Sequence, residues 1–316
     1  MSKKTSIGGQ AVIEGIMMKG PKKTALAVRM PDGSIDIEYI KEKHLKDKYK
    51  FFGLPVIRGT VNFIESMITG YSAMMKSAEK SGFTDIEEDK TKEKKNTKYE
   101  KLINALMVLA SVLGVVLGVF LFMYVPSLVF DLLNKLTTGN LSMYKALIEG
   151  FLKLTVFFVY MLLVAQMKDI KRVFAYHGAE HKTIFCYEAG EELTVENVKK
   201  HSRFHPRCGT SFMILMLSVG ILISLIITWA FPQLRESSFR LVWVAIKILS
   251  LPLICGIGYE LLKACGKHDN KLTRAIAAPG IWMQRITTNE PDDSMIELSI
   301  ESLKAVLPED ENEDNW

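Results

Sequence analysis

Two long stretches without a charged side chain limit what this sequence can fold into. Residues 102–130 contain no Asp, Glu, Lys or Arg, and neither do the 27 residues between Arg207 and Arg235. A helix needs about 20 apolar residues to cross a bilayer core. Residues 147–167 and 241–262 are of similar length, and their few charges lie close enough to an end to reach water. We therefore expect a mainly α-helical fold, a membrane helical bundle with four spans.

The basic residues predict the orientation of these spans. Lys and Arg number 20 before residue 102, two in 131–146, eight in 168–211, two in 232–240 and six after residue 262. Cytoplasmic loops of membrane proteins carry an excess of Lys and Arg. The alternation predicts a multi-pass protein of the cell membrane with both termini and the 168–211 loop in the cytoplasm. Because the first apolar run begins about 100 residues into the chain, no cleavable signal peptide is expected.

The net charge of +5 is explained by these basic loops rather than by a nucleic-acid surface. The basic residues are not interleaved with aromatic residues as they are in a groove that binds nucleic acid. The expected partner is therefore the lipid bilayer, with no nucleic acid, and the oligomeric state is left open. The four cysteines, Cys186, Cys208, Cys255 and Cys265, form no C-x-x-C pair and fall on the cytoplasmic side or within spans, where thiols stay reduced.

Residues 1–83 are expected to form a small α+β cytoplasmic unit. Thr24–Met30 and Ile35–Lys41 have the composition of strands, and Pro31–Ser34 between them is a turn signal. These segments predict a β-hairpin. Phe51–Ala78 is rich in apolar residues but is interrupted by glycine and charge, which favours an amphipathic helix over a fifth span.

The rest of the chain divides by composition into three further parts. Residues 84–101 are almost all polar or charged and predict a disordered linker. Residues 102–285 would form the transmembrane bundle with its histidine-rich loop. Residues 286–316 would form a C-terminal helix over Pro291–Leu307, where apolar residues have helical spacing, and then an acidic tail over Pro308–Trp316.

The most specific signal lies in the 168–211 loop. His177 and His181 are four residues apart, with Glu180 beside the second, so a helix would place both imidazoles on one face. The same spacing recurs about twenty residues later, followed by a cysteine. Imidazole and thiolate are metal ligands. The predicted metal ligands are His177, His181, His201, His205 and Cys208.

A helical hairpin can bring these side chains together. Residues 167–187 lack proline, so the second span is expected to continue as one helix into the cytoplasm. Thr194–His201 predicts a short second helix with Thr194 as its cap. His205–Gly209 is then an irregular return to the third span. The alternative is that the histidines are solvated side chains, since a single i, i+4 pair often occurs on a helix surface by chance.

Four segments resemble a known family. They are Gly8–Pro21 (GGQAVIEGIMMKGP), His177–Thr183 (HGAEHKT), Tyr187–Glu191 (YEAGE) and His201–Ser211 (HSRFHPRCGTS). In these motifs the chain resembles the YqhQ-like bacterial membrane proteins, a family of unknown function described as predicted metal-dependent enzymes. The resemblance covers essentially the whole chain except the linker and the acidic tail. It implies a divalent metal but neither a reaction nor a substrate.

Zinc is the expected metal because imidazole and thiolate both suit it. His-x-x-Glu-His is the pattern of inverted zinc hydrolases, in which the histidines bind the metal and the glutamate acts as general base. Glu180 would be that base. His177 and His181 with one of the three later ligands would leave an open, catalytic site, whereas both histidine pairs together would make a closed, structural one. The sequence leaves both arrangements open.

Three functions remain possible on this reasoning. The first is a metal-dependent hydrolase acting on peptides, membrane proteins or lipid-linked groups. The second is a non-catalytic scaffold with a structural metal, acting in membrane-protein assembly or quality control. The third is a transporter component, which the small number of charges within the spans disfavours.

Five further charged residues are candidates for the site. The glycines around Glu14 could bring a carboxylate or backbone amides near the metal, although a packed turn is an equal alternative. Some inverted zinc peptidases use a glutamate well downstream of the histidines as the third metal ligand. Glu260 lies downstream here, but we interpret its spacing as coincidence. Lys182, Arg203 and Arg207 could bind an anion beside the metal, or lipid headgroups.

Overall fold

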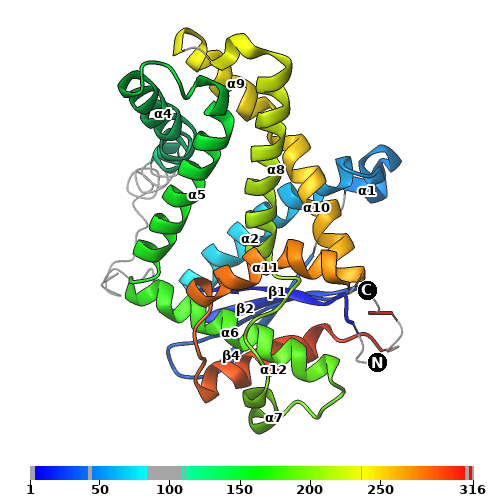
Figure 1. Cartoon of the computed structure of the whole chain (residues 1–316). Helices are drawn as coiled ribbons and strands as arrows, with labels where there is room; N and C mark the ends of the chain where they lie inside the picture. The colour runs from blue at the N-terminus through cyan, green and yellow to red at the C-terminus, as the bar shows by residue number, and fades with distance from the viewer. Residues whose placement is uncertain are drawn as a thin grey trace, which may run out of the picture. The chain divides into compact units, whose positions relative to one another are not determined.

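The computed structural model describes residues 4–41, 45–83, 109, 112–235, 237–268, 270–309 and 313–314. The expected mainly helical fold is confirmed, with one small antiparallel sheet near the N-terminus (Figure 1). The chain divides into two compact units, which are described separately. Unit 1 comprises Met1–Asp85, Met161–Met216 and Pro252–Trp316, and unit 2 comprises Ile86–Tyr160 and Leu217–Leu251. The predicted linker at 84–101 lies outside the described residues, apart from its place in this division.

The sheet of unit 1 has four antiparallel strands in the order of the sequence. They are β1 (Gly8–Val12), β2 (Gly15–Lys19), β3 (Thr24–Arg29) and β4 (Ile35–Ile40). The predicted hairpin is confirmed as β3–β4. The first hairpin was not predicted, because three glycines in two five-residue strands hide the strand signal. Its tight turn places Glu14 at φ 49°, a left-handed conformation.

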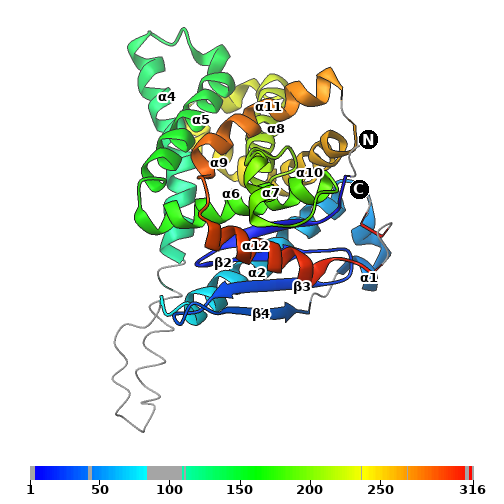
Figure 2. The same ribbon diagram turned by 90° about the horizontal axis from the view of Figure 1, so that it is seen from below.

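Helices cover both faces of the sheet (Figure 2). One face is packed by α6 (Lys168–Glu188) and α12 (Asp293–Val306), through a core that includes Ile16 and Met18. The other face packs around Leu26 and Ala73, the latter from α2 (Ile57–Lys80). Successive strand residues point to opposite faces, so both sets of apolar side chains are buried. The predicted amphipathic and C-terminal helices are confirmed as α2 and α12.

Unit 1 contains several further helices. They are α1 (Leu45–Lys48), η1 (Lys50–Gly53), α7 (Val195–Lys200), α10 (Leu251–Lys267), α11 (Lys271–Thr287) and the beginning of α8 (Gly209–Ala230). Thr194 caps α7 as predicted, its side chain accepting a hydrogen bond from the amide of Asn197. The prediction of one helix running from the second span to residue 187 is wrong. Met167 has extended backbone, with φ −66° and ψ 136°, and α6 starts afresh at Lys168.

Unit 2 is built almost entirely from helices. Its elements are η2 (Phe120–Tyr124, a π-helical turn), α4 (Val125–Leu136), η3 (Ser142–Tyr144), most of α5 (Lys145–Val164), the rest of α8, η4 (Pro232–Arg235), η5 (Ser237–Phe239) and α9 (Arg240–Leu249). A buried Glu149 carboxylate accepts hydrogen bonds from Ser127 Oγ at 2.7 Å and Trp243 Nε1 at 2.8 Å, and it forms an ion pair with Lys247. This network joins the helices α4, α5 and α9.

Within the described part of the chain, three helical segments are long and apolar enough to cross a membrane. They are Val112–Leu136, Ser142–Val164 and Gly209–Ala230. A fourth candidate, Leu241–Leu249 with Leu251–Lys267, is bent by 43° rather than continuous. Pro252 lies at this bend, and a proline cannot donate the backbone hydrogen bond that a continuous helix needs. Three to four candidate spans are consistent with the expected membrane protein.

Candidate metal centre

Helix α6 and the residue before α8 bring three predicted ligands together. His177 and His181 lie one turn apart on α6, with their ring centroids 4.4 Å apart. The thiol of Cys208 lies 3.1 Å from His177 Nε2. One ligand-capable atom from each of the three residues lies within 4.8 Å of the others, so the trio can surround one metal ion. Two segments far apart in sequence therefore meet, as the sequence predicted for these three side chains.

Backbone carbonyls orient both imidazoles. His177 Nδ1 lies 2.8 Å from the carbonyl oxygen of Thr287, and His181 Nδ1 lies 2.5 Å from that of Arg203. A carbonyl oxygen only accepts hydrogen bonds, so each Nδ1 carries the proton. In a neutral ring this leaves the lone pair on Nε2, and metal-binding histidines are commonly held by such a bond from the other ring nitrogen.

Gly178 allows α6 to pack closely against the segment after α11, next to Thr287, whose carbonyl oxygen orients His177. A Cβ at this position would lie 2.1 Å from the carbonyl oxygen of Asn289, which is far inside van der Waals contact. The amide of Asn289 also donates a hydrogen bond to the carbonyl oxygen of Phe174 at 2.8 Å. The glycine between the two histidines therefore sets the distance between α6 and the end of α11, where Thr287 lies.

The cluster favours the thiolate form of Cys208. Burial raises the pKa of the thiol, but the imidazoles of His177 and His181 outweigh it and hold the pKa well below its ordinary value of 9.0. Burial lowers the pKa of His177, whereas the charge on Cys208 raises it, with a net value of about 9. The amide of Thr210 in the first turn of α8 also lies 3.4 Å from Cys208 Sγ. A thiolate is the form of cysteine that binds metals or acts as a nucleophile.

Glu180 lies beside the cluster with one carboxylate oxygen unengaged. Its Oε1 accepts a hydrogen bond from the amide of Gly9 in β1 at 3.0 Å, while Oε2 is buried and has no hydrogen-bond partner among the described residues. Burial raises the pKa of this carboxyl group. A Cβ on Gly9 would come within 3.0 Å of the Glu180 carboxyl carbon and 2.9 Å of the Met17 carbonyl oxygen, so only glycine fits. The glycine run of β1 thus supplies a backbone amide to the site.

A cavity of about 720 Å³ opens beside these residues. Glu180, His181 and Cys208 line one side of it, and Gly8 and Gly9 line another. Polar side chains of α2 and α10 also line it, among them Asn62, Ser66, Thr69 and Tyr259, and so do the charged side chains of Lys19, Glu65 and Arg207. A small molecule or an extended chain segment in this cavity would therefore reach the cluster.

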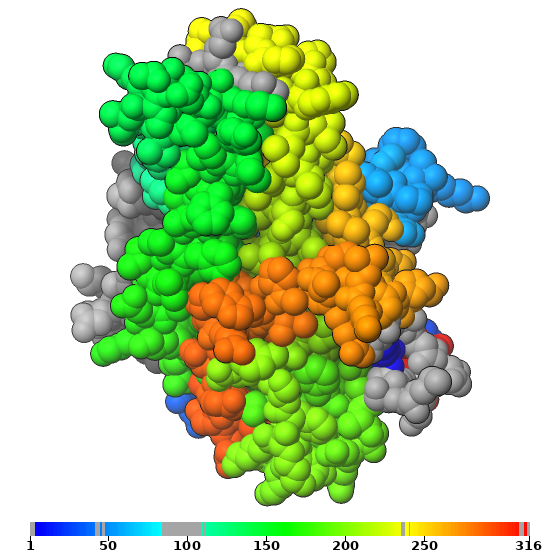
Figure 3. Space-filling model, viewed as in Figure 1, coloured from blue at the N-terminus to red at the C-terminus, as the bar shows by residue number. Residues whose placement is uncertain are grey.

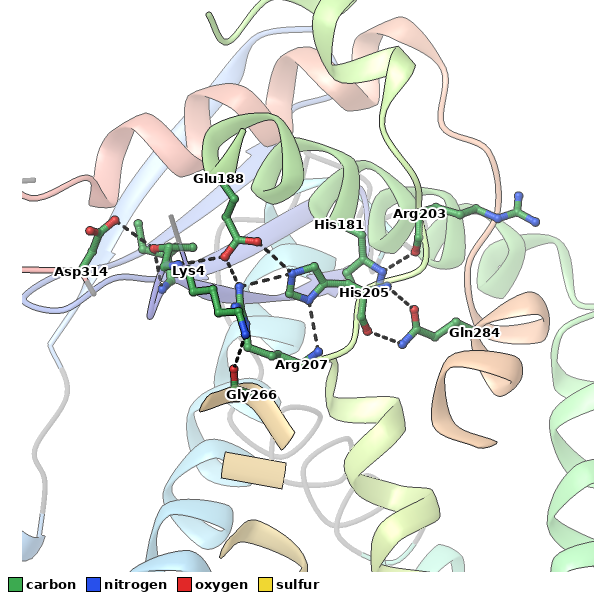
Figure 4. Close-up of polar contacts among 11 residues, drawn as sticks. Lys4, His181, Glu188, Arg203, His205, Arg207, Gly266, Gln284 and Asp314 are labelled. Atoms are coloured by element: carbon green, nitrogen blue, oxygen red, sulfur yellow. Dashed lines mark hydrogen bonds and ion pairs between the residues drawn. The ribbon is translucent and has the colours of Figure 1, made fainter. Parts of the chain in front are cut away.

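His205 lies next to the cluster but serves another set of contacts (Figure 4). Its amide donates to Gln284 Oε1 and its carbonyl accepts from Gln284 Nε2, both at 2.7 Å. Its ring Nε2 faces Glu188 at 3.8 Å, and Glu188 is also paired with Arg207. Burial lowers the pKa of His205 to about 4. The structure therefore places His205 where it fixes the 203–208 loop against α11.

His201 belongs to a separate group. Its Nε2 lies 3.3 Å from Glu191 Oε2, and Cys186 completes a second trio of ligand-capable atoms within 4.8 Å of one another. The two histidine pairs therefore do not surround one point, and the four-histidine arrangement is not the one that the described residues form.

The other charged residues considered from the sequence have partners away from the cluster. Glu14 is held by Arg172 and by the Tyr176 hydroxyl, the latter at 3.2 Å. Glu260 forms a two-pronged ion pair with Arg58, at 2.7 and 2.6 Å.

Lys182 and Arg203 form ion pairs with the same carboxylate. Their distances to Glu290 are 2.9 and 3.6 Å. Sequence reasoning missed Gln284 and Thr287, which hold the loop and His177, because neither stands in a motif and both lie about 80 or more residues away from their partners.

Comparison with known proteins assigns the chain to a family. The profile of a family described as "Protein of unknown function (DUF1385)" matches residues 54–309. The chain belongs to this family. It is 34% identical over 302 residues to "Uncharacterized protein YqhQ" of Bacillus subtilis (strain 168), covering 95% of this chain and 92% of that relative. No solved structure matches the chain. The DUF1385 match includes α6, Cys208 and α11 but begins after the strands that contribute Gly9.

Proposed function

We propose that this DUF1385 protein is an integral protein of the cell membrane that binds one divalent metal ion through His177, His181 and Cys208. The observation that carries the proposal is the convergence of two imidazoles on one thiol while a backbone carbonyl holds the Nδ1 of each ring. Two nitrogens and one thiolate form a ligand set that suits zinc.

The spacing of the ligand atoms supports a single ion. Around a tetrahedral zinc ion, neighbouring nitrogen and sulfur ligands lie about 3.5 Å apart. His177 Nε2 and Cys208 Sγ are 3.1 Å apart, and the three ligand atoms lie within 4.8 Å of one another. Small side-chain shifts would therefore complete the coordination. The hydrogen bonds that the two Nδ1 groups donate to the carbonyl oxygens of Thr287 and Arg203 would hold the rings during that adjustment.

We favour a metal-dependent hydrolase, because three protein ligands leave a fourth position for an exchangeable group. The adjacent cavity gives a substrate access to that position. A zinc ion bound here would supply Lewis acidity. Glu180 would hold or move a proton at Oε2, the oxygen that has no other partner among the described residues. The substrate would be a peptide, a membrane protein or a lipid-linked group.

The proposed topology places the metal centre at the cytoplasmic face. Cys208 directly precedes α8, a candidate span, so the centre would lie near one end of that span. The excess of Lys and Arg in 168–211 assigns this end, and both termini, to the cytoplasm. Reporter fusions after residues 83, 140, 190 and 236 test this orientation, and activity of a periplasmic-type reporter at 190 would overturn it.

A scaffold with a structural metal is the second candidate. The observation that favours it is that the imidazoles tie α6 to the end of α11 and to the 203–208 loop, so one ion would fasten three segments. A transporter role has less support, because both carboxylate oxygens of the buried Glu149 in unit 2 accept hydrogen bonds from neighbouring side chains, as in a structural network.

Metal analysis of the purified full-length protein tests the site. We expect one equivalent of zinc in the unmodified protein and its loss in His177→Ala and Cys208→Ser. His268→Ala is the matched control, because His268 is exposed and lies outside the cluster. Equal metal in the control and the two ligand variants would exclude the site. Glu180→Gln then separates the two functions: it keeps the metal in both cases, but removes the activity only of a hydrolase.

A further inference from the structure

A second cavity, of about 580 Å³, lies along α11. Its lining comes from α11, from the ends of α10 and α6, from the loop that precedes α8 and from Lys4 near the N-terminus. The buried residues of α11 follow one stripe, Ala277, Gly280, Met283, Gln284 and Thr287. The opposite stripe of the helix, including Arg274, Ala278 and Trp282, is exposed, and α11 lies open on the face shown in Figure 3.

One end of this cavity carries the cationic side chains of Lys4 and Arg274. His268 lines the same end, where α10 ends and α11 begins, and Lys4 Nζ donates to the carbonyl oxygen of Gly266 at 3.2 Å. Among the described lining residues the single acid is Glu188, which is paired with Arg207. The charge of this end is therefore complementary to an anionic group.

The rest of the cavity is mainly apolar. Ala278, Ile281 and Trp282 form its wall on α11, and Phe185 and Phe204 face them from the other elements. Trp282 is 53% exposed, so its apolar ring surface is available for contact with a ligand in this cavity. A ligand that fits both parts must join an anionic head to an apolar body.

The position of the cavity relative to the candidate spans indicates which class of ligand it binds. Lining residues 265–268 lie at the end of α10, the second half of the bent candidate span, and residues 206–207 lie in the loop just before Cys208 and the start of α8. Under the proposed topology both points lie at the cytoplasmic membrane surface. Basic and tryptophan side chains gather at this level, and basic pockets between spans bind lipid headgroups there.

We infer that this cavity binds one anionic phospholipid. Its phosphate lies against Lys4, His268 and Arg274, and the glycerol and upper acyl chain lie along Ala278, Ile281 and Trp282. Free phosphate would satisfy the cationic end but would leave the apolar wall uncovered. The inference is independent of the metal centre, because none of the three proposed metal ligands lines this cavity.

Native mass spectrometry of the full chain in detergent tests the inference. Phosphatidylglycerol and phosphatidylcholine with identical acyl chains are titrated separately, and the bound lipid is counted. We expect one tightly held phosphatidylglycerol per chain and at least tenfold weaker binding of phosphatidylcholine. Lys4→Gln with Arg274→Gln should weaken phosphatidylglycerol binding about tenfold or more, because each basic side chain contributes to headgroup attraction.

The matched control removes two positive charges from positions outside the cavity. Lys50→Gln with Lys271→Gln changes two exposed cations outside the cavity lining, the second of them on α11 itself. This control should bind phosphatidylglycerol as the unmodified protein does. Equal losses in both double variants would show general surface attraction and overturn the inference.

Two further measurements use the unmodified protein, so they do not depend on whether a variant folds. Equal retention of the two lipids would overturn the inference. Displacement of phosphatidylglycerol by inorganic phosphate at equal concentration would also overturn it, because the site would then recognise phosphate without the apolar body. Retention of phosphatidylglycerol in the presence of phosphate supports it.

Discussion

Gly178→Ala tests whether the close approach of α6 to residue 289 shapes the metal centre. The added Cβ would lie 2.1 Å from the Asn289 carbonyl oxygen and 3.5 Å from Pro291 Cδ. The first contact is with backbone, which cannot rotate away as a flexible side chain can. Either α6 or the segment after α11 must move by about 1 Å to restore an ordinary contact.

The magnitude of the effect follows from that displacement. Overpacking of a well-packed interior costs about 1–3 kcal/mol, and the higher helix propensity of alanine returns up to about 1 kcal/mol. We therefore expect a net loss of about 1–2 kcal/mol in the free energy of unfolding. The displaced segment also carries Thr287, whose carbonyl oxygen holds His177 Nδ1. Loss of such a supporting hydrogen bond lowers metal affinity about 10–100-fold.

The assay combines thermal unfolding in detergent with competition for zinc against a chelator of known affinity. Gly114→Ala is the control, because Gly114 lies in the helical span Val112–Leu136 and its added Cβ would meet nothing within 4 Å. We expect the control to retain its stability and zinc affinity. The reasoning is refuted if Gly178→Ala binds zinc as tightly as the control does, since the orientation of His177 would then not depend on this packing.

Four further outcomes are expected. Lys247→Met should destabilise the protein by about 3–5 kcal/mol in thermal unfolding, because it leaves the buried Glu149 carboxylate without its cation; an unchanged midpoint would contradict this. Glu260→Gln should leave the zinc content unchanged by metal analysis, because its carboxylate is paired elsewhere, and loss of zinc would make it a ligand after all. Burial raises the pKa of Cys186 to about 11, so its alkylation at pH 7 should be slow and should accelerate as the pH rises toward that value. Added zinc should protect Cys208 from alkylation and leave the rate at Cys186 unchanged, as peptide mass spectrometry can measure.

Local patterns predicted several elements of this fold correctly. The β3–β4 hairpin followed from two segments of strand-like composition around Pro31–Ser34, and α12 followed from apolar residues at helical spacing. The cap of α7 at Thr194 followed from its side-chain chemistry. Each of these signals lies within a few residues of the element that it specifies, so it can be read without knowledge of the fold.

Other elements depend on contacts that sequence patterns do not contain. The strands β1 and β2 are rich in glycine because β1 must approach Glu180 and β2 must approach the backbone of residue 27. Their intrinsic strand signal is weak for that reason. The break at Met167, between α5 and α6, also lacks a proline or glycine to announce it.

The sequence by itself determined the apolar segments, the pairing of His177 and His181 on one helix face, and the proximity of Glu180 to them, because helical periodicity fixes these relations locally. Only the tertiary structure decided which later residue joins the pair. Cys208 reaches His177, whereas His205 turns toward Glu188 and His201 toward Glu191. The physical reason is that loop direction and side-chain rotamer are set by packing against α11 and β1, and these contacts come from residues far away in the chain.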